Sequence, residues 1–422
     1  MASAATDGAT EHTPLIALLT ATAISLAGSR LTLVAIPWFV LQTTGDPARV
    51  GLTAFAGSLA YVLAALLGGA LVDRVGFRAV SVYADIASGL AVGSIPLLYR
   101  TTGLSLWQLL SLVFLGTFCN TPGSTARQGL LPDLAARAGM PLERANASVQ
   151  AIRTFAQLVG PVLAGLLIAL IATSDVLWLD AATFIISAVL IGAMVPATAT
   201  SDTSEPPARR HYLSEMRDGF RFLRQDRLIT TLAINSLFGN FLGGALFGVV
   251  LPVYARANYG KALGLGLLLT ALGGGGLLGT LLYGVVGHRL SRRSVYIGSL
   301  VLSTLARCPL IIPLPIAAAV AALAVSGFGS GPGSPIVLTT YQERVPAALR
   351  GRVFGAIIAL NTAADPLALL ATGYALASVG LMATIICLNG ASLLVCAWVA
   401  TNRVLRAIDT TRMPDPATIP RE

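Results

Sequence analysis

Charged residues are scarce in this chain. Only 11% of its 422 residues are Asp, Glu, Lys or Arg, and 27 arginines stand beside a single lysine, Lys261. A soluble domain carries about 25% charged residues. Because 55% of the residues are hydrophobic, a soluble fold has too little interior to hide them from water. The composition therefore excludes an ordinary soluble protein and indicates a chain embedded in lipid.

Histidine and cysteine are also rare, and their spacing supports no metal site. The three histidines and four cysteines are scattered, with no CxxC pair and no His/Cys cluster. The chain also lacks a Ser/His/Asp arrangement, a phosphate-binding loop and closely spaced carboxylates in or near the membrane. We therefore expect no metal, no cofactor and no enzymatic activity. The net charge of +9 forms no basic patch with interleaved aromatics, so we expect no nucleic-acid partner.

The chain does contain many long apolar runs. A membrane helix needs about 20 apolar residues, and the sequence predicts an all-α integral membrane protein with twelve transmembrane helices. Residues 14–196 and 228–401 are expected to form two six-helix bundles. Residues 1–13 are expected to be a disordered cytoplasmic N-terminus, 197–227 a cytoplasmic linker and 402–422 a cytoplasmic tail. The predicted segments are Pro14–Leu41, Ala48–Val72, Ala79–Leu98, Ser105–Ala126, Asn146–Ala172, Val176–Pro196, Leu228–Ala255, Ala262–Gly287, Ser294–Pro313, Pro315–Thr340, Val353–Ala375 and Val379–Thr401.

A short charged loop is repeated in the two halves of the chain. GGALVDRVGFRAV at 68–80 returns as YGVVGHRLSRRSV at 283–295, and an offset of 215 residues aligns Arg78 with Arg293. Nearly the same offset relates Gly, Pro and Gln residues in other segments. Parallel repeats about an axis along the membrane normal are typical of two-bundle transporters. The repeat therefore indicates a duplicated membrane bundle.

Arginines are concentrated in the loops on one side of the predicted membrane. That side includes the linker, Arg127 and the tail, whereas the opposite loops hold only Arg49, Arg100, Arg256 and Lys261. The basic side is expected to face the cytoplasm. Both termini are then cytoplasmic, and the protein lies in a bacterial cytoplasmic membrane. Within the linker, an amphipathic helix is expected at Leu213–Arg227. It lies at the membrane interface or packs on the bundles, and its apolar stripe fits both.

Ionisable residues inside the predicted helices are the strongest functional signal, because a charge near the bilayer centre is expensive. Asp365 lies about 18 Å into its helix, near the midplane of a ~30 Å core, and Pro366 follows it. Asp85 lies about 9 Å from the cytoplasmic end of its helix, and Arg153 has a similar depth. Both aspartates are candidates for proton coupling, and permanently paired or capping carboxylates are the alternative. Asp180 is expected near the external interface, where its charge costs little.

Polar and aromatic side chains at mid-depth are candidates for a substrate cavity. A pocket for amphipathic molecules is mostly apolar and contains a few polar groups. Each candidate is alternatively a packing residue, and the arginine among them is alternatively held by backbone carbonyls. The cavity candidates are Arg30, Asn120, Asn235, Asn240, Phe241 and Asn361.

The loop at 68–80 resembles the first signature of the major facilitator superfamily, a Gly-x-Leu-x-Asp-Arg-x-Gly-Arg-Arg pattern between the second and third helices. Phe77 stands where a basic residue is usual. The matching residues are Gly69, Leu71, Asp73, Arg74, Gly76 and Arg78. The resemblance implies that this loop latches the bundles on the cytoplasmic side when the transporter opens outward.

Two further stretches resemble drug-efflux members of that superfamily. LVGPVLAGLL at 158–167 is similar to the antiporter signature of helix five through Gly160, Pro161 and Gly165, with alanine at two positions where glycine is common. STARQGLLPDLAARAGMPLERANA resembles the bacterial branch of Tap-type and macrolide exporters. The resemblance implies proton-driven export of small amphipathic compounds by alternating access, in a monomer whose partners are substrate, protons and lipid. A dedicated metabolite or siderophore transporter, and a receptor or scaffold that does not transport, are the alternatives.

Overall fold

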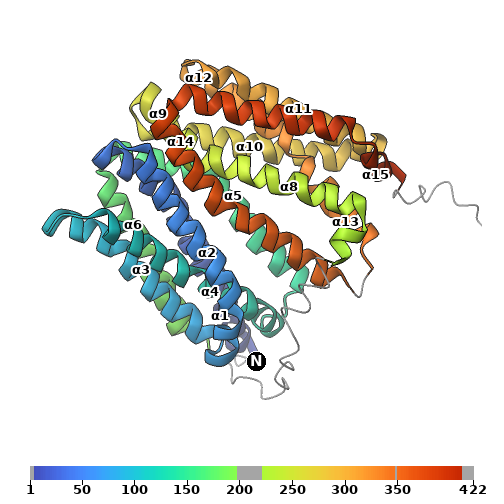
Figure 1. Cartoon of the computed structure of the whole chain (residues 1–422). Coiled ribbons are helices and arrows are strands. Elements are labelled where there is room, and N and C mark those ends of the chain that lie inside the picture. Colours follow the sequence, from blue (N-terminus) through green and yellow to red (C-terminus); the bar gives the residue numbers. More distant parts are fainter. Residues whose placement is uncertain (1–3, 197–220, 347–348, 411–422) are drawn as a thin grey trace, which may run out of the picture. The chain divides into compact units, whose positions relative to one another are not determined.

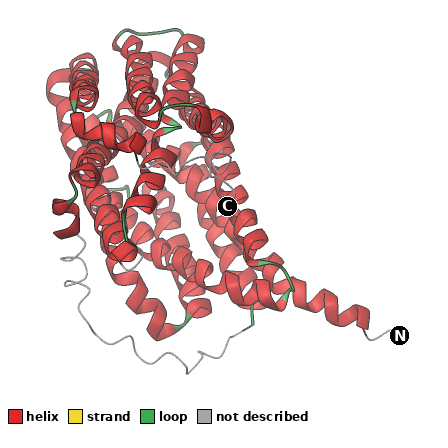
Figure 2. Ribbon diagram, turned by 90° about the vertical axis from the view of Figure 1, so that its right-hand side faces the viewer, coloured by secondary structure: helices red, strands yellow, loops and turns green. Residues whose placement is uncertain are grey.

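The computed structural model of the chain describes residues 4–196, 221–346 and 349–410. Every regular element among these residues is a helix, joined by short loops (Figure 2). The first helix begins at Ala4, within the segment that was predicted as a disordered N-terminus. Most of the predicted linker and tail lies outside the described residues.

Six helices form the described first half of the chain, and the described second half has eight α-helices, because several of its spans are interrupted (Figure 1). The first six are α1 (Ala4–Thr44), α2 (Pro47–Val75), α3 (Phe77–Thr101), α4 (Leu106–Arg137), α5 (Leu142–Leu170) and α6 (Thr173–Met194). The second set comprises α8 (Arg227–Ala245), continued by the π turn η1 (Leu246–Val250) and α9 (Leu251–Tyr259), α10 (Ala262–Val286), η2 (Gly287–Arg289), α11 (Arg292–Arg307), η3 (Cys308–Ile311), α12 (Ile316–Ser330), α13 (Gly333–Arg344), α14 (Arg350–Thr401), η5 (Arg403–Arg406) and α15 (Ala407–Thr410).

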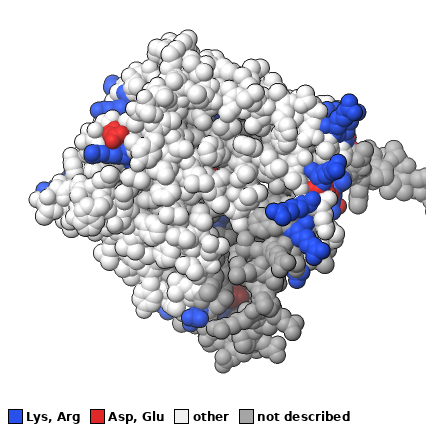
Figure 3. Space-filling model, viewed as in Figure 1, with Lys and Arg blue, Asp and Glu red and all other residues white. Residues whose placement is uncertain are grey.

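The twelve-span architecture is confirmed. Ten helical stretches among the described residues are long and apolar enough to cross a membrane. Helix α4 adds a span that carries more charge, and α14 counts twice because Gly380 (φ 84°, ψ 173°) interrupts its 52 residues. The charged atoms gather near helix ends, and the visible surface between them is largely uncharged (Figure 3). This pattern fits a protein whose middle faces hydrocarbon.

Several predicted boundaries differ from the observed ones. Helix α4 extends to Arg137 instead of Ala126, so Arg127 lies inside a helix and not in a loop. The tenth span is divided at Gly331 and Pro332, since α12 ends at Ser330 and α13 begins at Gly333. Apolarity alone does not show these features, because polar groups and breaks inside a span become acceptable once they have partners.

The chain divides into two compact units, and their division differs from the predicted bundles. Unit 1 comprises residues 1–205, 245–270 and 366–381, and unit 2 comprises 206–244, 271–365 and 382–422. In unit 1, α3 packs on α4 and α6, and α1 packs on α5 and α6. Two stretches from the second half of the sequence thus belong to the unit that contains α1 to α6.

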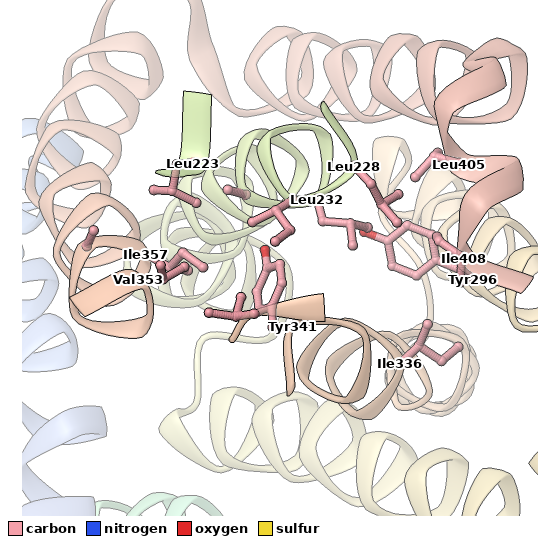
Figure 4. Packing of buried hydrophobic residues seen from close by; sticks show 14 of the residues in the cluster. Leu223, Leu228, Leu232, Tyr296, Ile336, Tyr341, Val353, Ile357, Leu405 and Ile408 are labelled. Atoms are coloured by element: carbon pink, nitrogen blue, oxygen red, sulfur yellow. The ribbon is translucent and has the colours of Figure 1, made fainter. Parts of the chain in front are cut away.

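Unit 2 has its own apolar core around Tyr296 and Tyr341 (Figure 4). Leucine, isoleucine and valine side chains from α8, α13, α14, η5 and α15 surround the two rings. At one end of this core, Asp226 caps α8 by accepting hydrogen bonds from the backbone N–H groups of residues 228 and 229. Its other oxygen accepts from Nε of Arg344 at 2.6 Å. The start of α8 and the end of α13 are therefore tied together.

Candidate functional site

The loop that resembles the family signature turns at a glycine with a left-handed backbone. Gly76 has φ 89°, and its N–H donates to the carbonyl of Val72 at 2.9 Å, so it ends α2 where α3 begins. A side chain at this φ is strained. The Arg78 guanidinium donates to the carbonyl of Gly192 near the end of α6, whereas Arg74 is exposed. Gly69 and Asp73 lie in α2, and the side-chain contacts at these positions lie outside the described structure.

The repeated loop in unit 2 makes a matching contact. Arg293, which the repeat aligns with Arg78, donates to the carbonyl of Ala400 near the end of α14 at 3.3 Å. Each arginine therefore binds the last span of its half of the sequence, and each has a buried Nε without a partner among the described atoms. Ser291, at the start of α11, also donates to Asp409 of α15. The sequence repeat thus corresponds to a repeated structural role.

Asp85 is held in a buried ion pair. Nη1 of Arg127 lies 2.7 and 2.8 Å from its two oxygens, and the hydroxyl of Ser187 donates to Oδ2 at 2.6 Å. Asp85 is fully buried, and Arg127 is 6% exposed. Nη2 of Arg127 also reaches the hydroxyl of Ser25 at 3.4 Å. From the sequence, Asp85 was a candidate for proton coupling or a paired carboxylate. The structure shows it in an ion pair.

Arg30 and Arg153 are partly buried in unit 1, and neither makes an ion pair with a residue that the structure describes. A Cβ at Gly160 would lie 2.5 Å from the Cβ of Arg30, so the small residue of the antiporter-like sequence makes room for α1. Arg153 lines a cavity of about 30 Å³ together with Arg127, and its Nε is buried without a partner among the described atoms. Two arginines in the same unit thus have no carboxylate partner among the side chains that the structure describes.

The rest of the antiporter-like sequence lies in a close interface within unit 1. A Cβ at Gly165 would lie 2.8 Å from the carbonyl oxygen of Ala262 in α10. Gly266 of α10 approaches the carbonyl of Pro161 so closely that no side chain fits there. The Thr270 hydroxyl donates to the carbonyl of Leu158 at 3.0 Å, also between α10 and α5. The motif therefore provides backbone contact between helices.

A cavity of about 620 Å³ lies in unit 2 and brings together three of the six predicted cavity residues. Asn235 donates from Nδ2 to the hydroxyl of Tyr296 at 2.5 Å. The Oδ1 atoms of Asn235 and Asn361 are buried and have no partner among the described atoms. The lining residues, which include no charged side chain, are Asn235, Ser236, Gly239, Asn240, Tyr296, Leu300, Ser330, Gly333, Ser334, Val337, Leu338, Tyr341, Phe354, Ile357, Ile358 and Asn361.

The other predicted site residues lie outside this cavity. Arg30 and Asn120 belong to unit 1, and Phe241 lies on α8 but does not line the cavity. Asp365 lies in α14, one turn after Asn361, is partly buried and makes no hydrogen bond or ion pair with a described residue.

Sequence reasoning missed three residues that the structure brings into these sites. Tyr296 and Tyr341 line the unit 2 cavity, and Arg127 was assigned to a loop. The Asp180 side chain, expected near the external interface, is buried against neighbouring helices at 1% exposure. The sequence contained a signal for this burial, because α6 carries a polar residue at every second turn (Thr173, Asp180 and Ser187). All three side chains are buried.

Comparison with known proteins decides the family. The model of the Major Facilitator Superfamily matches residues 18–362 and 234–417. The chain belongs to the major facilitator superfamily. It is therefore a multi-pass membrane transporter of small substrates and not an enzyme.

Curated relatives of this transporter include efflux proteins. It is 33% identical to the multidrug efflux pump Tap of Mycolicibacterium fortuitum over 90% of this chain and 93% of the relative. It is 34% identical to the multidrug efflux pump Tap of Mycobacterium tuberculosis (strain ATCC 25618 / H37Rv), over 95% and 96%. It is 29% identical to the enterobactin exporter EntS of Escherichia coli O1:K1 / APEC, over 84% and 83%.

Solved structures of transporters share the fold. The nucleoside transporter NupG matches with a TM-score of 0.74 at 13% identity, over 92% of this chain and 98% of that chain. A bacterial homologue of the human lysosomal transporter Spinster matches with a TM-score of 0.70 at 13% identity, over 96% and 99%. At these identities the likeness concerns the fold alone.

Proposed function

We propose that this transporter is a secondary active exporter of small amphipathic compounds such as drugs, antibiotics or secondary metabolites. It exchanges them for protons by alternating access, as a monomer in a bacterial cytoplasmic membrane with both termini inside. Similarity to multidrug efflux pumps over nine-tenths of the chain supports the export direction. The antiporter-like sequence at Gly160, Pro161 and Gly165 supports exchange.

The unit 2 cavity is the observation that carries the proposal. Its volume of about 620 Å³ lies within the range of drug-sized sites. Its lining is mostly apolar and uncharged, and the buried oxygens of Asn235 and Asn361 accept no hydrogen bond from the described residues. A buried acceptor without a partner costs about 1–3 kcal/mol. A substrate with an apolar body and an N–H or O–H donor would satisfy these groups.

Asp365 and Asp85 remain the proposed coupling carboxylates, in different settings. Asp365 follows the cavity residue Asn361 by one helical turn and has no partner among the described residues, so it is free to bind a proton close to the substrate. Asp85 must first lose the contacts of Arg127 and Ser187. The loop with Gly69, Asp73, Arg74, Gly76 and Arg78 serves as the proposed cytoplasmic latch.

Filling the cavity tests the proposal. Gly333 lines the cavity and has open space where a side chain would begin. We expect Gly333→Trp to abolish export of ethidium, an amphipathic dye with amino donors, from efflux-deficient cells that express the transporter. The control is Gly298→Trp on α11, which also has open space but does not line the cavity. Dye export that persists in Gly333→Trp would show that substrate does not pass through this cavity.

A dedicated siderophore or metabolite exporter is the second candidate. The similarity to EntS supports it, and Arg30 and Arg153, which lack carboxylate partners among the described residues, suit an anionic ligand. In that case, deletion of the transporter would leave drug susceptibility unchanged while an anionic metabolite accumulates inside the cell. A receptor that does not transport would bind ethidium without moving it across proteoliposome membranes.

A further inference from the structure

Arg30 and Arg153 place two positive charges on the sides of α1 and α5 that face each other in unit 1. The two helices pack together, and a Cβ at Gly160 of α5 would lie 2.5 Å from the Cβ of Arg30. Arg153 precedes Gly160 by about two helical turns, so it lies on the same face of α5. The two guanidinium groups are close enough for their charges to repel each other.

The buried acid of α6 lies on the opposite side of α1 from Arg30. Gly28 and Thr32 of α1 both meet Asp180, since a Cβ at Gly28 would collide with the carboxyl group and the Thr32 hydroxyl donates to it. Arg30 lies midway between these two residues in the sequence, about 200° from each around the helix axis, and it faces Gly160 instead. Asp180 therefore forms no ion pair with Arg30.

Arg153 lines a cavity of about 30 Å³ between α1, α4 and α5. Its Nε is buried and has no partner among the atoms that the structure describes. The other guanidinium group of the cavity, that of Arg127, is paired with Asp85. Leu26 of α1 also lines the cavity, and Arg30 follows it by one turn. Because helix side chains lean toward the N-terminus, Arg30 extends over the turn that contains Leu26.

An anion would supply what this part of unit 1 lacks. Two buried like charges without a counter-charge are costly, and neither Arg30 nor Arg153 has a carboxylate partner in the described part of the chain. A guanidinium group presents its N–H donors in a planar fork that fits carboxylate, phosphate and sulfate oxygens. The cavity has room for about one water-sized group. It therefore suits a charged head group and not the body of a drug.

We propose that Arg30 and Arg153 form a binding site for a small anionic group, such as a carboxylate, phosphate or sulfate, at the interface of α1 and α5. An anion between the two guanidinium groups replaces their repulsion by charge-assisted hydrogen bonds. The site belongs to unit 1, whereas the uncharged cavity belongs to unit 2. The inference therefore does not depend on the proposed export of amphipathic compounds.

Thermal unfolding of the full-length protein in an uncharged detergent tests the site. The probes are sodium benzoate and sodium phosphate, each added at an ionic strength held constant with sodium chloride. We expect a higher midpoint for the wild type, because a ligand that binds the folded state stabilises it. Arg30→Gln and Arg153→Gln should each weaken the affinity roughly tenfold or more, the loss expected for one hydrogen bond to a charged group. A wild type that responds to neither probe would overturn the proposal.

Matched variants separate anion binding from a structural role. Arg100→Gln, which removes an exposed arginine of the same unit from its surface pair with Asp175, should respond to the probes like the wild type. Arg153→Lys keeps a positive charge and should bind the probes better than Arg153→Gln. Without probe, Arg30→Gln and Arg153→Gln should unfold no lower than the wild type, because one of two repelling charges is gone. Lower midpoints without probe, together with unchanged affinities, would overturn the site in favour of structural arginines.

The source of the anionic group follows from which probe binds. A response to benzoate alone would support the site and assign it to organic acids, and a response to phosphate alone would assign it to phosphate groups. In phosphatidylcholine nanodiscs, stabilisation by added phosphatidylglycerol that Arg153→Gln abolishes would support the site with a lipid headgroup as its ligand.

Ethidium export tests the proposed function separately from this site. Export by a wild type that binds neither probe would overturn only the anion site. Anion binding by a wild type that exports no ethidium would overturn only the proposed export.

Discussion

Asp85 and Asp180 show two ways of burying a carboxyl group in one helical bundle. Asp85 is paired with Arg127, since both of its oxygens lie within 2.8 Å of one guanidinium nitrogen, the geometry of a charge-assisted pair. Asp180 is surrounded by threonine hydroxyls and lacks a cation among the described residues. The first carboxyl group has a buried cation as its partner, whereas hydroxyl groups alone bind the second among the described residues.

Removal of the Asp85 charge is expected to destabilise the protein. Asp85→Asn leaves the guanidinium of Arg127 buried at 6% exposure without its counter-charge. The loss of one partner from a buried ion pair costs about 3–5 kcal/mol. Thermal unfolding of the purified protein in detergent should therefore show a clearly lower midpoint.

The exposed ion pair between Arg100 and Asp175 is the control for this prediction. Its side chains are 51% and 37% exposed, and such surface pairs contribute about 0–1 kcal/mol. We expect Asp175→Asn to unfold close to the wild-type temperature. Equal midpoints for Asp85→Asn and Asp175→Asn would contradict the assignment of Asp85 and Arg127 as a structural pair.

At the scale of helices, unit 1 contains interfaces in which helix backbones touch at glycine residues. A Cβ at Gly51 of α2 would lie 2.6 Å from the Cα of Gly373 in α14, and Gly266 of α10 approaches Pro161 of α5 in the same manner. The two glycines that face their partners, Gly51 and Gly266, are 215 residues apart, which is the offset of the repeat. Both contacts join helices from different halves of the sequence and must separate if those halves move apart.

A side chain at Gly51 is expected to weaken this contact. Gly51→Val forces α2 away from residues 366–381, at a cost of about 1–3 kcal/mol for the packed arrangement. We expect slower ethidium transport and faster labelling of a cysteine introduced at Leu369, which lies beside Gly51. Gly57→Ala on the same helix is the control, because its Cβ would lie 3.4 Å from Val113 in ordinary contact. Unchanged labelling in Gly51→Val would mean that this interface stays closed during transport.

At the scale of the whole molecule, the two halves of the sequence share a contact made by the repeated loop. They differ in the charge of their buried side chains. Arg78 and Arg293 each bind a carbonyl near the end of the last span of their half. The buried ionic groups Asp85 and Arg127 lie in unit 1, whereas the cavity of unit 2 has no charged lining. One contact of the repeated loop is thus common to both halves, whereas these buried side chains differ.

The two repeated arginines are expected to contribute similarly to stability. Arg78→Gln and Arg293→Gln each remove a charged donor from a helix-end carbonyl, which costs about 1–3 kcal/mol. Thermal unfolding should show lower midpoints of similar size for both variants. Arg74→Gln, at an exposed position of the same loop, should leave the midpoint unchanged. A loss confined to one of the two repeated arginines would contradict their equivalence.

Much of the architecture could be predicted because it depends on local properties of the chain. Span length follows from the thickness of the hydrocarbon core, so the predicted and observed helices agree within a few residues for α2, α3 and α10. The turn at Gly76 follows from a backbone that glycine adopts without strain. The prediction failed at Arg127, because a buried charge becomes acceptable in α4 only through a partner that lies 42 residues away.

The sequence by itself thus determined the membrane class, the twelve spans, the repeat and three residues of the unit 2 cavity. Only the tertiary structure decided which helix faces meet. A helix in lipid is apolar on its outer side as well as toward its neighbours, so the hydrophobic pattern does not mark the inner face. The pairing of Asp85 with Arg127, the enclosure of Asp180 by Thr32 and Thr183, and the contact of Gly51 with Gly373 all depend on that choice.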